Sequence, residues 1–83
     1  MRRELGRFVV VDTEICHGKP TFAGTRVMVW NVIEQVTEGM DWDEITREWR
    51  GRVPREAIEE AAQLVRVGIL SSDGKRLREP VAG

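Results

Sequence analysis

Gly39 and Gly51 interrupt the part of the chain that has helical periodicity, and they limit the length of every helix it can form. Before Gly39, apolar residues recur at the spacing i, i+3, i+4, i+7, which is typical of an amphipathic helix; they are Val29, Val32, Ile33 and Val36. Glycine is also the residue preferred just beyond a helix C-terminus. The pattern therefore predicts three short helices, over about residues 29–39, 42–50 and 54–68.

Residues near the two breaks fit the starts of the second and third helices. Asp41 is a good N-cap, and Glu44 stands three residues later as in a capping box. Pro54 suits the first position of a helix, where a backbone N–H would be unpaired in any case. Trp42 and Trp49 share one helical face, which favours core packing, whereas Trp30 is a candidate for a subunit or partner surface.

The segment before the helices predicts short strands. Residues 8–11 are apolar and mostly β-branched, and residues 15–26 contain two glycines and a proline, which exclude a helix there. We therefore predict a β-arm over about residues 7–28. Because two or three short strands do not form a stable sheet alone, we expect the arm to pair with a second copy in a homodimer. The residues assigned to this dimeric or structural role are Phe8, Val10, Gly18, Pro20, Gly24 and Arg26.

The chain has 83 residues, which predicts one domain over residues 1–70. Residues 71–83 have no period and many helix breakers, so we expect a flexible tail there. No apolar stretch approaches the roughly 20 residues needed to span a bilayer, and no secretory signal is evident. With the single Cys16, these features favour a cytoplasmic location without contact with a membrane.

Arginines gather between the second and third predicted helices, although the formal net charge is −1. A short turn containing glycine between two helices is typical of a helix-turn-helix, in which the second helix reads DNA with its first residues. Arg55 is on this reasoning the best candidate for a base or phosphate contact. The alternative is a solvated cluster that complements the end of a helix. The candidate DNA-binding residues are Arg47, Arg50, Arg52 and Arg55.

Two further basic sites have alternative interpretations. Arg26 either pairs with a carboxylate such as Asp12 or Glu14, which we favour, or contacts phosphate directly. The tail is either disordered or folds on a partner whose cleft is acidic. The candidate partner-binding residues of the tail are Lys75, Arg76, Leu77 and Arg78.

Residue patterns for catalysis are weak. Residues 18–21 look like part of a phosphate-binding loop, but Pro20 stands where that motif needs Ser or Thr. Cys16 and His17 would point to opposite faces of a strand, and the chain has no other Cys or His to complete a zinc site. We therefore expect Cys16 to be a small buried apolar residue and predict no enzyme activity, metal or cofactor.

Two motifs carry a resemblance to a known family. Gly18-Lys19-Pro20 and Gly24-Thr25-Arg26-Val27, followed by a helix of the form Asp-x-x-Glu-Ile from Asp41 to Ile45, resemble bacterial family four-three-three of the domain-of-unknown-function series. The last helix also resembles that family over Arg55 to Ala61. One departure is that the second helix of such proteins often ends in an aromatic residue and proline, whereas here Arg50-Gly51-Arg52 follows Trp49.

The resemblance implies a fold and a function. The implied fold is mainly α, with a three-helix helix-turn-helix core of the homeodomain-like, winged-helix-related kind after the short β-arm. The implied function is that of a VapB-type antitoxin, which neutralises a PIN-like nuclease toxin and binds double-stranded DNA to repress its own operon. The alternative is a dimeric protein-interaction module that does not bind DNA.

Overall fold

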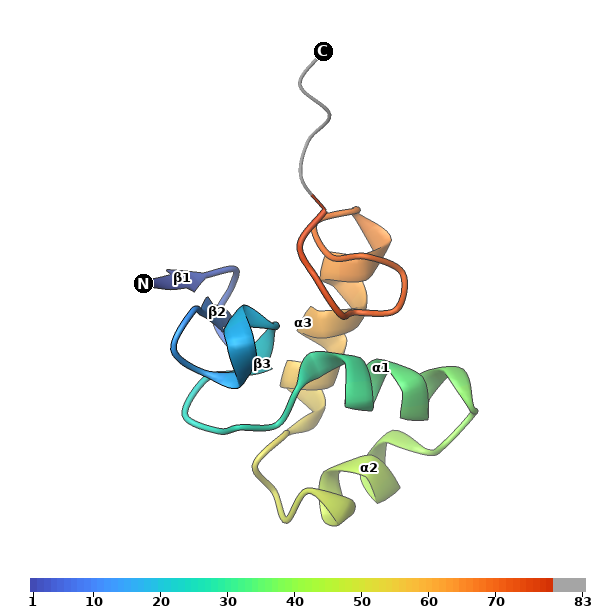
Figure 1. Cartoon of the computed structure of the whole chain (residues 1–83). Helices are drawn as coiled ribbons and strands as arrows, with labels where there is room; N and C mark the ends of the chain where they lie inside the picture. Colours follow the sequence, from blue (N-terminus) through green and yellow to red (C-terminus); the bar gives the residue numbers. More distant parts are fainter. Residues whose placement is uncertain (79–83) are drawn as a thin grey trace.

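The computed structural model describes residues 1–78, and over this range three helices follow a three-stranded antiparallel sheet (Figure 1). The strands are β1 (Arg2–Glu4), β2 (Val9–Asp12) and β3 (Thr21–Phe22), with a short 3-10 turn, η1, at Cys16–Gly18. The helices are α1 (Val29–Thr37), α2 (Trp42–Glu48) and α3 (Arg55–Arg66). The three predicted helices are thus present, each two or three residues shorter than expected.

The sheet is completed within one chain, with β2 in the middle. Val9 of β2 lies opposite Phe22 of β3, and both side chains are buried. On the other side of β2, Val11 lies opposite Arg3 of β1. β1 was not predicted because its three residues are charged and exposed, so they carry no apolar alternation. Three strands of one chain therefore form the sheet, and the expected pairing of the arm with a second copy stays a prediction.

Backbone geometry explains where the helices end. Gly39 has φ +86°, a value that glycine adopts without steric cost, and it follows α1 as predicted. After α2, Arg50 at φ +56° and Gly51 at φ +76° prevent the helix from continuing. Asp41 caps α2, since its carboxylate accepts a hydrogen bond from the backbone N–H of Asp43 at 3.4 Å. Pro54 is the N-cap of α3 and not its first helical residue.

The core lies where the three helices meet the sheet. Trp42 and Trp49 are half-buried against it, and the Trp49 indole N–H donates a hydrogen bond to Oε1 of Gln35 on α1 at 2.8 Å. The most fully buried apolar side chains come from all three helices, β2, β3 and the segment on either side of α3; they are Val9, Phe22, Val29, Val32, Ile45, Val53, Ile58 and Leu70. None of the described helices is long and apolar enough to cross a membrane.

The segment after α3 folds back onto α1 and is not a free tail over residues 71–78 (Figure 1). Leu70 is fully buried and forms an isolated β-bridge with Leu77, which packs against the core. Gly74 is buried against Trp30 and Ile33. The remainder of the predicted tail, residues 79–83, lies outside the described residues.

Candidate functional site

The four predicted DNA-binding arginines fall into two groups. Arg55, the first residue of α3, pairs with Asp43 of α2 at 2.8 Å between Nη1 and Oδ1, and its guanidinium lies 5.6 Å from the centre of the Trp42 ring. Arg47 is exposed one helical turn after Asp43, on the same side of α2. Arg47 and Arg55 therefore lie on the same side of the molecule, where α2 faces the start of α3.

Arg50 and Arg52 belong to a different surface, together with Arg26 from the loop before α1. These three exposed residues, here called the basic corner, line one hollow of about 360 Å³. Its other lining residues are Val27, Asn31, Glu48 and Trp49. Within residues 1–78, none of the three guanidinium groups forms an ion pair with a carboxylate. Sequence reasoning had placed Arg26 apart from the other two.

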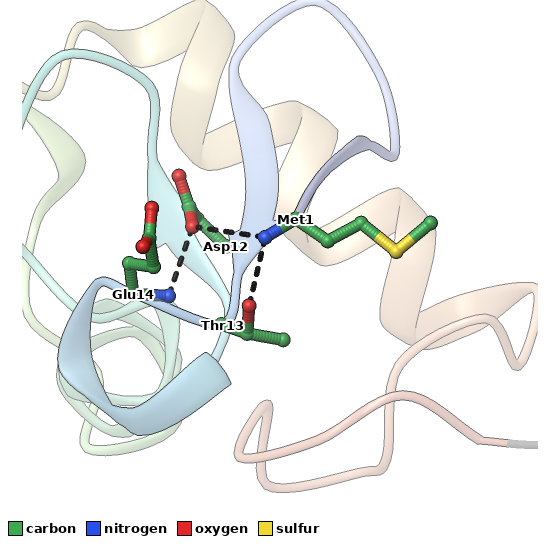
Figure 2. A network of polar contacts seen from close by, with 4 residues as sticks. All are labelled: Met1, Asp12, Thr13 and Glu14. Carbon is green, nitrogen blue, oxygen red and sulfur yellow. Dashed lines mark hydrogen bonds and ion pairs between the residues drawn. The ribbon is translucent and has the colours of Figure 1, made fainter.

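The expected ion pair between Arg26 and Asp12 or Glu14 is absent among the described residues. Figure 2 shows the arrangement around Asp12: its Oδ1 accepts a hydrogen bond from the backbone N–H of Glu14 at 2.9 Å and lies 4.0 Å from the Met1 amino group. That amino group also donates to Oγ1 of Thr13 at 2.8 Å. Asp12 thus binds the backbone at the end of β2, and Arg26 lies with Arg50 and Arg52 in the basic corner.

The other residues assigned to a dimeric or structural role lie within the single chain. Val10 and Pro20 are buried, Phe8 is half-buried against the core, and Gly18 and Gly24 both have φ +77°. These positions explain the glycine and proline motif through the path of one chain. They supply no evidence for a second copy at the sheet.

Glu60 of α3 is a structural residue that the sequence did not reveal. Its Oε1 accepts a hydrogen bond from the backbone N–H of Arg7 at 2.7 Å, and its Oε2 accepts from Phe8 and Val9 at 2.7 and 2.8 Å. One carboxylate therefore binds three consecutive N–H groups and connects the start of β2 to α3. The Glu60 carboxylate thus lies against residues 7–9, whereas Glu56 and Glu59 are exposed on α3.

The outer face of α1 carries two more hollows, the first of which adjoins the basic corner. One, of about 240 Å³, is lined by Trp30, Asn31, Glu34, Gln35, Glu38 and Trp49. The other, of about 330 Å³, lies between α1 and residues 72–75. Lys75, a predicted partner-binding residue, lies with its Nζ 5.1 Å from the centre of the Trp30 ring. Arg76 and Arg78 are exposed, and Leu77 is half-buried.

Asp73 gives a pH-dependent prediction for residues 71–78. Hydrogen bonds from the Ser71 hydroxyl and then from the backbone N–H of Lys75 lower the pKa of the Asp73 carboxyl below its ordinary value. The lowered pKa means that the contribution of Asp73 to stability is present above the ordinary pKa of aspartate. It is lost as the pH falls through the folded-state value. We expect a carboxyl ¹³C titration by NMR to give a lower pKa for Asp73 in the unaltered protein than in a Ser71→Ala variant. Equal pKa values in the two proteins would contradict this.

Cys16 and His17 lie in η1 and not on a strand, and their φ values are +50° and +58°. The Cys16 thiol lies 3.7 Å from the backbone carbonyl oxygen of Arg26, and the residue is half-buried. The prediction that Cys16 and His17 point to opposite faces of a strand was therefore wrong. Within residues 1–78, no group of three or more His, Cys, Asp or Glu residues is placed to hold a metal ion.

Comparison with known proteins gives one match. The family model described as Protein of unknown function (DUF433) matches residues 9–63, a range from the start of β2 to near the end of α3. This range contains both glycine motifs, the basic corner, and Arg47 and Arg55. No curated protein and no solved structure matches the chain.

Proposed function

Because the chain belongs to the DUF433 family, whose function is unknown, we propose its role from the geometry and from the resemblance to antitoxins: a non-enzymatic, dimeric DNA-binding antitoxin that neutralises a PIN-like nuclease. The observation that carries the DNA-binding part is the position of Arg47 and Arg55. Both are exposed where α2 meets the N-terminus of α3, a helix of 12 residues. The first residues of such a helix are those that a helix-turn-helix directs at DNA.

The pairing of Arg55 with Asp43 does not prevent a phosphate contact. Their side chains are 55% and 61% exposed, and exposed ion pairs stabilise proteins by about 0–1 kcal/mol. A phosphate at the N-terminus of α3 would be bound by the guanidinium and by the positive end of the helix together. Exchanging Asp43 for a phosphate therefore costs little free energy.

Neutralisation of a nuclease is the part of the proposal that depends on the resemblance. The tail hypothesis needs a change, because the described part of the tail packs on the domain and Lys75 lies over Trp30. We propose that the toxin contacts this folded segment through Arg76 and Arg78, which are exposed. Their guanidinium groups suit the carboxylate cluster of a PIN-like nuclease cleft.

A protein-interaction module without DNA binding is the second candidate. It is favoured by Glu56 and Glu59, which are exposed on the first two turns of α3 beside Arg55. Carboxylates in this position repel phosphates. The two candidates differ in whether a complex with DNA forms at low salt.

A binding titration at several salt concentrations tests the proposal. We expect the protein to bind duplex DNA from upstream of its coding sequence. Two phosphate contacts in each chain of a dimer give a slope of log K against log salt of about −4. Replacing Arg47 and Arg55 together with alanine should reduce the slope to near zero and lower the affinity at least about 100-fold, as measured by fluorescence anisotropy.

Arg2 and Arg3 provide the charge-matched control for this titration. They are exposed on β1, and replacing both with alanine removes the same charge as the variant of Arg47 and Arg55. We expect this control to keep the slope and nearly all of the affinity. No binding of the unaltered protein at low salt, or an equal loss in both variants, would contradict the proposed DNA interface.

A further inference from the structure

Charge is divided along the outer face of α1. Glu34 and Glu38, here called the acidic end, lie exposed at the C-terminal end of this helix. The basic corner lies beyond its N-terminal end, where Arg26 precedes α1 and Arg50 and Arg52 follow α2. Glu48 also lines the hollow at the basic corner, but three arginines outnumber it, so the face has a negative end and a positive end.

The two ends belong to one continuous surface. The hollow at the basic corner shares Asn31 and Trp49 with the next hollow along α1, and that hollow contains Glu34 and Glu38. Its remaining lining residues, Trp30 and Gln35, are half-buried, as are Asn31 and Trp49. Protein interfaces typically have aromatic residues at the centre and polar or charged residues at the rim, and this surface has the same arrangement.

The charge arrangement does not stabilise α1 itself. The positive end of a helix dipole is at the N-terminus, so acidic residues stabilise the first turn and basic residues the last. In α1 the first turn has no acidic residue and the last turn has no basic residue, while Glu38 is the C-cap. The acidic end is thus unfavourable for the helix. Lys75 lines a hollow with Glu34 and Glu38, but it forms no ion pair with either within residues 1–78, so a cation from outside the chain would relieve the acidic end.

We propose that a second copy of the chain supplies that cation: two α1 helices pack antiparallel about a two-fold axis. The acidic end of each copy then faces the basic corner of the other, and Trp30, Asn31 and Trp49 lie near the axis. An interface of this kind requires a surface that is complementary to itself, and the outer face of α1 meets this condition. The inference rests on the proposed dimer, but it places the interface on α1 and not on the β-arm.

Charge reversal on each side tests the interface by sedimentation equilibrium. We expect the unaltered protein to be a dimer. The variant E34R/E38R and the variant R50E/R52E should each dissociate, with Kd raised at least about 100-fold. An equimolar mixture of the two should form a heterodimer with affinity near that of the unaltered protein, because each reversed end then meets a reversed partner end.

The variant R2E/R3E is the matched control for net charge. It introduces the same charge change as R50E/R52E, but on β1. It should remain a dimer alone, and it should not restore assembly when mixed with E34R/E38R. Restoration by R2E/R3E would show that net charge alone drives association, and it would overturn the proposed interface.

The remaining outcomes distinguish the interface from the proposed dimer. If the unaltered protein is a monomer, both the dimer and the interface are wrong. If the reversed variants remain dimers, the dimer stands and the α1 interface is wrong.

Should a reversed variant fail to fold, Asn31→Cys in a Cys16→Ser background replaces it, because Asn31 lies near the proposed two-fold axis. We expect the Asn31→Cys variant to form a disulfide-linked dimer and Glu59→Cys in the same background to form none. Absence of the disulfide-linked dimer from Asn31→Cys would overturn the interface.

Discussion

Replacing Glu60 with alanine is expected to lower the free energy of unfolding by about 3 kcal/mol, because three backbone N–H groups lose their shared acceptor. The donors belong to Arg7, Phe8 and Val9, and the latter two contacts are partly buried. A hydrogen bond to a charged group contributes about 1.5–3 kcal/mol, and three bonds to one carboxylate are not additive. Urea denaturation followed by circular dichroism measures the change.

Glu59 provides the control for this substitution. It precedes Glu60 on α3, but it is exposed, so Glu59→Ala should change the free energy of unfolding by no more than about 0.5 kcal/mol. Similar losses in the two variants would mean that helix propensity or net charge, and not the contact with residues 7–9, explains the result.

Gly6 gives an independent way to disrupt the same contact. A Cβ atom at this position would lie 2.6 Å from Cδ and Oε1 of Glu60, closer than real Cβ contacts permit. Gly6→Ala should therefore displace the carboxylate and destabilise the protein by a similar amount. In a double-mutant cycle with Glu60→Ala, the second substitution should add little. Full additivity would contradict the proposed contact.

The helices were predictable, whereas the strand β1 and the role of Glu60 were not. Periodic apolar residues and Gly39 are local signals, and they placed α1 at its observed start. The partners of Glu60 lie 51–53 positions away in the sequence and are backbone groups of unremarkable residues. Residue type does not show which backbone N–H groups will donate to a distant carboxylate. This contact can therefore be recognised only once the tertiary structure is known.

The candidate site was predicted as one cluster because the four arginines are close in sequence. The left-handed backbone at Arg50 and Gly51 turns the chain between α2 and α3, and it separates Arg50 and Arg52 from Arg47 and Arg55. Arg26 joins the first pair from a distant loop. A turn conformation with a positive φ at arginine is not marked by residue type, so the division could not be read from the sequence.

The predicted flexible tail was misread because its breakers are turn residues of an ordered loop. Ser71, Asp73 and Gly74 are typical of disorder when they stand alone, but here they lie between Leu70 and Leu77, which form an isolated bridge. Two apolar residues seven positions apart are a weak signal in a sequence. They become informative only where the start of α1 leaves a surface that both the leucines and Gly74 can cover.

Gly74→Ala is the second substitution with a large expected effect, about 3 kcal/mol of lost stability. Gly74 has φ +73°, a conformation that costs an L-residue about 1–2 kcal/mol. Its added Cβ would also lie 3.0 Å from Cγ1 of Ile33 and 3.3 Å from the Trp30 Cα. The Ile33 side chain has some freedom, but the backbone of α1 does not, so the loop must move away from the helix.

Gly24 separates the two causes, because it has φ +77° and no atom within 4 Å of the added Cβ. Gly24→Ala should cost about 1–2 kcal/mol from backbone strain alone. The additional loss in Gly74→Ala then measures the packing of residues 71–78 against α1, and urea denaturation of both variants provides it. Amide hydrogen exchange should also rise only in Gly74→Ala at Ser71 and Arg78, whose backbone N–H groups donate to the carbonyl oxygens of Arg76 and Ile69. Equal losses with unchanged exchange would show that this segment does not pack on α1, as the sequence alone had predicted.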